Sequence, residues 1–159
     1  MAKTNPVVQV EVKAVLPTSG GCAVFLGNAR KIFVIYIDHS VGLAITLAMR
    51  QEPKERPQTH DLIGSILAGL GARVQRVVIN HFKDGVYYAR LILEAENELH
   101  ARKILELDAR PSDSLALAVQ AKAPVYITRE VWDSVEDMTA MYQKMESQGF
   151  QFSSEEPEL

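Results

Sequence analysis

The alternation of apolar and polar residues changes several times along the chain, and each change marks the end of one expected element. Val8 to Lys13 alternates with a period of two, which is typical of a half-buried strand. The Pro17 to Gly21 cluster then turns the chain into an apolar segment at Cys22 to Leu26. Lys31 to Asp38 is a continuous β-rich run, which indicates a strand covered on both faces. Val41 to Met49 changes to a helical period, so strands followed by a helix are expected here.

Similar patterns return after a polar loop with two prolines at Gln51 to Gln58. Thr59 is expected to cap a helix that runs to about Leu70, and Gly71 to end it. The Lys83-Asp84-Gly85 turn separates two further strands. The later expected elements are strands at Arg73 to Phe82, Val86 to Glu94, Ile104 to Leu107 and Pro124 to Thr128, a helix at Leu115 to Ala121 capped by Ser112, and a final helix starting at Ser134 with Val135, Met138, Met141, Tyr142 and Met145 along one side.

In chain order, these elements indicate an internal duplication. Three strands and a helix are expected over Val7 to Met49, and the same series over Val74 to Gln120. Within it, Ile37-Asp38 matches Leu107-Asp108, and Val41 takes the place of Asp113. Chance similarity between amphipathic segments is the alternative. The predicted fold class is α+β, with residues 1–150 as one domain built from the two pseudo-repeats and a C-terminal helix, followed by an acidic flexible tail at residues 151–159.

Composition limits the kinds of function that fit the chain. With 159 residues and 47% hydrophobic content, it can bury one proper core. Lys and Arg number 17 against 20 Asp and Glu, so any binding of phosphate must be local. Cys22 is the only cysteine, which excludes an intrachain disulfide and a cysteine-based zinc site. A cytoplasmic protein without a membrane partner is expected, with DNA or RNA as the candidate partner; a homo-oligomer is compatible with the sequence.

Two Arg-Pro units, each placed before an expected helix, carry the candidate chemistry. They are Arg56-Pro57-Gln58-Thr59-His60-Asp61 and Asp108-Ala109-Arg110-Pro111-Ser112-Asp113. Their acids Asp61, Asp108 and Asp113 are candidate catalytic residues and candidate ligands of Mg²⁺ or Mn²⁺, because carboxylates commonly hold the ions that assist phosphodiester hydrolysis. The alternative is capping, since the partial positive charge at a helix N-terminus stabilises an acid without any further function.

The other side chains of these units fit the same chemistry. The imidazole of His60 can act as general acid or base, or can instead donate a hydrogen bond to a carbonyl. Arg56 and Arg110 are candidate substrate-binding residues that clamp a phosphate, together with Thr59 and Ser112. The alternative for the arginines is a structural latch, for example Arg110 with Asp61.

The two units also carry a family resemblance. Arg-Pro-x-Thr-His-Asp-Leu, followed by Asp-Ala-Arg-Pro-Ser-Asp-Ser-Leu-Ala-Leu-Ala, resembles the bifunctional nuclease domain family, whose members cut both DNA and RNA. The resemblance spans roughly Val7 to Thr128 and implies the fold of that family. Members commonly have a glutamate in an Ile-Gly-x-x-Glu-Ala pattern, where this chain has Val41. The resemblance therefore also implies that a carboxylate is missing here, with Asp38 as a nearby substitute.

The function expected first is a metal-assisted nuclease of low sequence specificity, which hydrolyses phosphodiester bonds in DNA and RNA. The alternative is a non-catalytic regulatory or binding domain, which uses the same acidic and Arg-Pro cleft for a small anion or a protein partner. The lack of a basic surface and of interleaved exposed aromatic residues favours the alternative, and the two intact units favour the nuclease.

Overall fold

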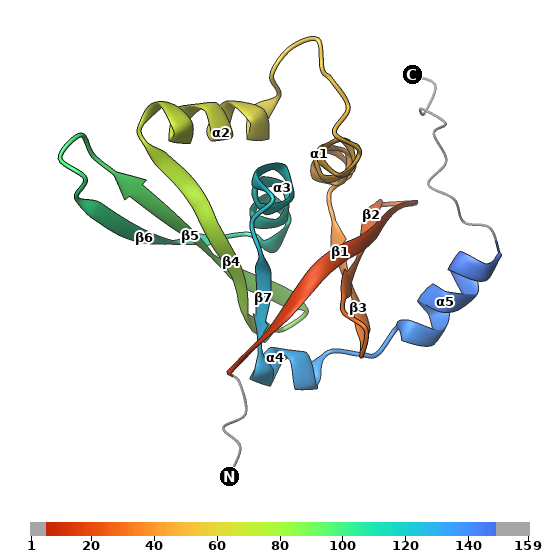
Figure 1. Ribbon diagram of the computed structural model, residues 1–159. Coiled ribbons are helices and arrows are strands. Elements are labelled where there is room, and N and C mark those ends of the chain that lie inside the picture. The colour runs from red at the N-terminus through yellow and green to blue at the C-terminus, as the bar shows by residue number, and fades with distance from the viewer. Residues whose placement is uncertain (1–5, 149–159) are drawn as a thin grey trace.

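The described part of the chain, residues 6–148 of a computed structural model, begins with three antiparallel strands (Figure 1). β1 (Val7–Thr18) pairs with β2 (Gly21–Gly27), and β2 pairs with β3 (Ile32–Ile37). Helix α1 (His39–Arg50) follows directly. The predicted tail at residues 151–159 lies outside the described residues.

A second set of three antiparallel strands is formed by β4 (Ala72–Lys83), β5 (Val86–Glu96) and β6 (Arg102–Ala109). Helix α3 (Pro111–Ala121) follows β6 as α1 follows β3. Helix α2 (Thr59–Gly69) lies in the connection between the two sets. Both halves thus have the predicted order of three strands and a helix, while the superposition of the two halves stays a prediction.

A short strand between the two sets joins them into one sheet. β7 (Val125–Thr128) pairs antiparallel with β1 and parallel with β4. The result is a seven-stranded mixed sheet with the strand order β3-β2-β1-β7-β4-β5-β6. This α+β fold confirms the fold class predicted from the sequence.

The main core lies between the sheet and the helices α1 and α3, which pack against each other on one face (Figure 1). The fully buried side chains of this core include Val24, Ile45, Val77 and Leu115. Gly42 allows α1 to approach β2, because a Cβ atom at this position would collide with the side chain of Cys22. Gly42 therefore permits close packing of α1 on the sheet.

The chain after β7 differs from the single C-terminal helix that the sequence predicts. It forms α4 (Arg129–Ser134) and α5 (Thr139–Ser147), so Ser134 ends one helix and does not cap the next. Instead, Oδ1 of Asp137 accepts the backbone N–H of Thr139 at 2.9 Å. Tyr142 and Met145 of α5 pack on a second apolar cluster, which lies on β1, β2 and β3.

No helix of residues 6–148 is long and apolar enough to cross a membrane.

A candidate active site between the two Arg-Pro units

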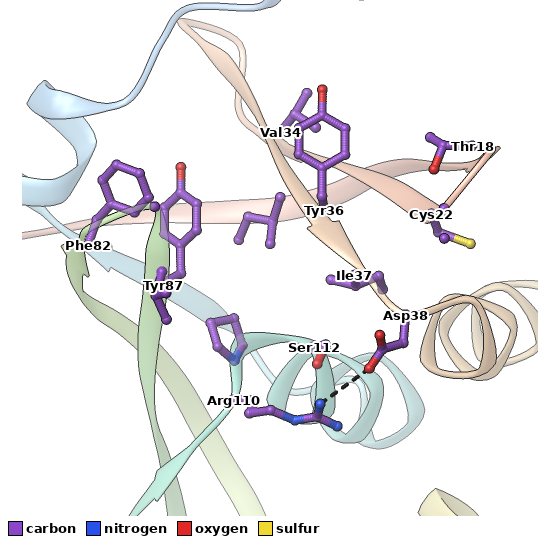
Figure 2. Close-up of a pocket in the computed structure, with 16 residues that line it drawn as sticks. Thr18, Cys22, Val34, Tyr36, Ile37, Asp38, Phe82, Tyr87, Arg110 and Ser112 are labelled. Carbon is purple, nitrogen blue, oxygen red and sulfur yellow. Dashed lines mark hydrogen bonds and ion pairs between the residues drawn. The ribbon is translucent and has the colours of Figure 1, made fainter.

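The start of α3 places an arginine beside two carboxylates. Arg110 is the N-cap residue, and Pro111 occupies the first turn, where its missing N–H and fixed φ suit a helix start. Arg110 Nε donates a hydrogen bond of 2.9 Å to Oδ2 of Asp113. Its Nη1 reaches Oδ2 of Asp38, the N-cap residue of α1, at 3.3 Å (Figure 2). One guanidinium therefore links the starts of two helices.

The start of α2 joins the same group. His60 Nε2 lies 3.0 Å from Oδ1 of Asp113, which connects the two Arg-Pro units directly. Gln120 of α3 holds His60 from the other side, since its Nε2 donates to the His60 carbonyl oxygen at 3.0 Å. Gly64 makes room for this contact, because a Cβ atom there would collide with the Gln120 amide. We call His60, Asp113, Arg110 and Asp38 the charged row.

The charges of the row stabilise one another. Partial burial of Asp113 favours its neutral form, but the hydrogen bonds and charges of Arg110 and His60 outweigh this and lower the pKa of Asp113 below its ordinary value. The Asp113 hydrogen bond is likewise the main cause that raises the pKa of Arg110, with Asp38 adding to it. Asp113 is therefore an anion at neutral pH, and it accepts from Arg110 with one oxygen and contacts His60 with the other.

Asp61 belongs to a separate group, although it follows His60 directly. Both of its oxygens lie 2.8 Å from Lys54 Nζ, and Oδ2 accepts the backbone N–H of Gln58 at 2.8 Å. The Lys54 hydrogen bond is the main cause that lowers the pKa of Asp61, followed by the bond from Gln58. Gln58 is the N-cap residue of α2, and the two residues form a capping box. The contacts of Asp61 are those of a capping residue, with Lys54 as its counter-ion.

The remaining predicted site residues lie at different places. Asp108 is on β6, and its neighbours Leu107 and Ala109 alternate with it, so it faces away from Ala109, which packs on the main core beneath the helices. Arg56 and Thr59 are exposed at the entrance to α2, and Thr59 is the first helical residue and not the cap. Ser112 is buried in the first turn of α3, where Arg110 and not Ser112 is the cap.

The predicted metal ligands Asp61, Asp108 and Asp113 are not gathered around one point. Asp61 is bound by Lys54, Asp113 by Arg110 and His60, and Asp108 lies on β6 outside both groups. Within residues 6–148, no cluster of three or more His, Cys, Asp or Glu side chains is placed to hold one metal ion. The two acids of the charged row, Asp38 and Asp113, both contact the Arg110 guanidinium.

A pocket of about 760 Å³ adjoins the charged row (Figure 2). Arg110, Asp38 and Ser112 line one end of it. The aromatic rings of Tyr36, Phe82 and Tyr87 line other parts, with Phe82 and Tyr87 only 4.3 Å apart between ring centroids. We call this space the aromatic pocket. A smaller hollow of about 400 Å³ lies on the other side of α2's first turn, beside Lys54, Asp61 and Gln120.

The aromatic pocket was not expected from the sequence. The run from Lys31 to Asp38 suggested a strand covered on both faces, but Tyr36 near its end is 71% exposed. The exposed residues Tyr36 and Phe82 therefore line the same pocket as Arg110, whereas no exposed aromatic residues among the basic ones were expected from the sequence. The available signal was Tyr36 itself, because a residue with a polar hydroxyl in an otherwise aliphatic run suits a surface that is half open to solvent.

Val41 occupies the third position of α1, as Asp113 does in α3, but its side chain is 6% exposed and belongs to the main core. Its position in the helix agrees with the match predicted from the sequence. Its environment does not offer a place for a charged group beside the row.

Comparison with known proteins gives matches over a range that includes both Arg-Pro units. The model of the bifunctional nuclease domain matches residues 24–139. An uncharacterized protein of Mycobacterium tuberculosis is 34% identical over 104 residues, which cover 65% of this chain and 58% of that protein. Bifunctional nuclease 1 of Oryza sativa and the bifunctional nuclease of Oryza minuta are each 26% identical over 98 residues, which cover 61% of this chain and 29% of those proteins. The chain thus spans less than two thirds of the length of these relatives, and by its matched domain it belongs to the bifunctional nuclease domain family.

Proposed function

We propose that the chain is a nuclease that hydrolyses phosphodiester bonds in DNA and RNA with low sequence specificity, at the charged row. The observation that carries this proposal is the contact of His60 with Asp113, at 3.0 Å, beside an arginine that opens onto a pocket. Membership of the bifunctional nuclease domain family and the names of the rice relatives support it.

In this proposal His60 moves the proton and Asp113 orients it. When Asp113 accepts the Nε2 proton of His60, the lone pair of Nδ1 is free to take a proton from the attacking water. The negative charge of Asp113 also stabilises the imidazolium that forms. Gln120 fixes the backbone of His60 by its hydrogen bond to the carbonyl oxygen. Asp113 and Gln120 act as positioning residues, and His60 is the proposed catalytic residue.

Arg110 is the proposed phosphate-binding residue. Its Nε and Nη1 are engaged by Asp113 and Asp38, while its side chain remains 62% exposed and lines the aromatic pocket. A phosphate that approaches from the pocket can accept from the exposed side of the guanidinium. Arg56 and Thr59 would extend the contact along the backbone of the substrate from the entrance to α2, and Ser112 from the wall of the pocket.

The aromatic pocket is the proposed place for the bases next to the cleaved bond. Unpaired bases stack on aromatic side chains without regard to sequence, which agrees with low specificity. Tyr36 and Phe82 offer such rings within the same pocket as Arg110. A local site of this kind also agrees with a net charge of -3, because binding does not depend on the charge of the whole protein.

The requirement for Mg²⁺ or Mn²⁺ remains a prediction. The three acids predicted as ligands do not come together, so no step of the proposal passes through a metal ion. A bound ion would supply additional stabilisation of charge on the phosphoryl oxygens. Chelation of the purified protein tests this part separately.

The direct test is cleavage of labelled single-stranded DNA and RNA oligonucleotides by the purified chain, with Mg²⁺, with Mn²⁺ and with a chelator. We expect His60→Gln to lower the rate by about 100-fold or more, as is usual for loss of a general acid or base. His100→Gln is the matched control, because His100 Nδ1 also lies 3.0 Å from a carboxylate, Glu96, at the distant turn between β5 and β6. Equal cleavage by wild type and His60→Gln would contradict the proposed role of His60.

The second candidate is a binding domain without catalysis. It is favoured by the two carboxylates that already hold Arg110, since they make the row a link between α1 and α3. In that case the wild type binds oligonucleotides or small anions in an anisotropy measurement, and no metal condition gives cleavage.

A further inference from the structure

The two ends of the sheet differ in how their outer strands are covered. At one end, the segment before α5 lies along β3: Met138 donates its N–H to the Ile32 carbonyl oxygen at 2.7 Å, and Thr139 Oγ1 accepts the Ile32 N–H at 3.0 Å. At the other end, β6 pairs with β5 and is the last strand in the sheet order of residues 6–148. The outer edge of β6 is therefore open to another strand.

β6 lacks most of the features that keep an edge strand from pairing. It contains no proline, and its register with β5 runs from Arg102 to Ala109 without a bulge. Two of its apolar side chains are exposed, Ile104 at 55% and Leu107 at 43%. It does carry charges, which often protect an edge, so their order along the strand decides what the edge can accept.

The basic and acidic residues of β6 lie at opposite ends of the strand. The basic residues Arg102 and Lys103 lie at the start of the strand, and the acidic residues Glu106 and Asp108 lie near its end. A second β6 that runs antiparallel to the first brings its acidic end to the basic end of its neighbour. Opposite charges placed directly across two strands attract, whereas a parallel arrangement in register would place like charges together.

Backbone geometry selects the register of such a pair. On an edge strand, alternate residues direct their N–H and C=O groups outward, so a two-fold axis must relate residues of the same parity. An axis through Leu105 meets this condition and pairs the strand from Arg102 to Asp108. Arg102 then lies opposite Asp108 on one face, and on the other face Leu105 meets its own copy.

On the side of the helices, Leu105 is the residue of β6 at the centre of this contact. Leu105 packs partly on the main core and so faces the helices. Asp61 and Ser65 of α2 face α1, since both line a hollow with Leu47 and Gln51. The exposed residues Leu62 and Ile66 lie one position further round α2 than these two residues, and the exposed Leu70 follows as the C-cap residue of the helix.

We propose that two copies of this chain form a homodimer by antiparallel pairing of their β6 strands about Leu105, with two Arg102–Asp108 ion pairs across the junction. The pairing extends the seven-stranded sheet across both copies. It does not depend on the proposed nuclease function. Because β6 leads directly into Arg110, the two charged rows lie at opposite ends of the paired strands.

Charge reversal tests the pairing in a way that other interfaces do not reproduce. The wild type is expected to be a dimer in sedimentation and light-scattering measurements. Arg102→Asp places two acids opposite each other, and Asp108→Arg places two arginines opposite each other, so each variant alone is expected to dissociate at least about 10-fold more readily. When the two variants are mixed, both pairs become complementary again, and a heterodimer is expected to form.

The controls separate pairing from folding. Arg30→Asp and Asp133→Arg make the same charge changes at exposed residues away from β6, and they are expected to leave the dimer intact alone and in mixture. Arg102 also lies 3.8 Å from Glu94 within its own chain, so melting temperatures accompany every variant. Leu107→Lys avoids that contact and places a lysine opposite Lys103 of the second copy, which also weakens the dimer. A monomeric wild type at tens of micromolar, or a mixture that stays monomeric, overturns the proposal.

Discussion

Helices α2 and α3 start with similar residues, yet the acids at their third positions have different partners. Asp61 accepts from its own cap residue Gln58 and from Lys54 in the loop before the helix. Asp113 contacts His60 of the other helix and Arg110, which also reaches Asp38. A helix N-terminus stabilises either acid, so the position alone does not reveal a function. The partners distinguish the two acids, because those of Asp61 complete a cap and those of Asp113 join three helix starts next to a pocket.

The start of α1 extends the comparison, because its third residue is Val41. We expect Val41→Glu to lower the free energy of unfolding by about 3–5 kcal/mol, since it leaves an uncompensated charge in the core. Chemical denaturation measures this, and calorimetry with Mn²⁺ is expected to show no gain in affinity. Leu43→Glu, at an exposed position of the same helix, is the control. Unchanged stability together with tighter metal binding would place position 41 in the site after all.

Replacing each acid by its amide tests the difference between Asp61 and Asp113 directly. We expect Asp113→Asn to lower the rate of oligonucleotide cleavage by about 100-fold, or about 2.7 kcal/mol in the barrier, because His60 loses its orienting anion. Asp61→Asn is expected to keep a rate within a few fold of wild type when both are assayed well below their melting temperatures. Similar losses for the two variants would show that the separate groups act as one.

The role of Asp61 as a cap predicts a smaller effect, on stability alone. Asp61→Ala removes the acceptor for the Gln58 N–H and the partner of Lys54, and we expect a loss of about 1 kcal/mol in urea unfolding. Ser65→Ala, one turn later on the same helix, is expected to change little. A rate of cleavage per folded molecule that falls with Asp61→Ala would assign it more than a structural role.

The smallest expected effect is on how the stability of the fold depends on pH. The pKa of Asp61 lies below its ordinary value of 3.8, so its ionised form stabilises the folded state. This contribution is fully present above pH 3.8 and is lost as the pH falls through the lower folded value. The difference in stability between wild type and Asp61→Asn is thus expected to narrow in acid. A difference that stays constant far below pH 3.8 would exclude the lowered pKa as its source.

Strands and helices were predictable because their patterns are local, while the geometry of the site depends on where elements end. The sequence predicted Asp108 at the end of a strand, but β6 continues to Ala109. Asp108 thus lies within the strand. Because side chains alternate along a strand and Ala109 packs on the core beneath the helices, the side chain of Asp108 points away from them. Asp38 directly follows β3 and reaches Arg110 instead.

Further features of the site could not be predicted without the tertiary structure. The contact of His60 with Asp113 joins residues 53 positions apart, and no local pattern states which face of α2 meets α3. Gln120 was not distinguished by its sequence context, although its amide holds the backbone of His60. The aromatic pocket likewise combines β3 with the turn between β4 and β5, which are brought together only by the folded sheet.

The placement of β7 has a consequence for the order in which the chain folds during its synthesis. The three strands of each half can pair with their neighbours as soon as they emerge, because consecutive strands are joined by short turns or loops. β7 is the only strand that touches both halves among the described residues, and it is made after all the others. Its partners on β1 lie more than a hundred residues earlier in the chain, a contact of high sequence separation that forms slowly. Until Thr128 leaves the ribosome, the nascent chain therefore lacks the strand that joins the inner edges on β1 and β4 into one sheet.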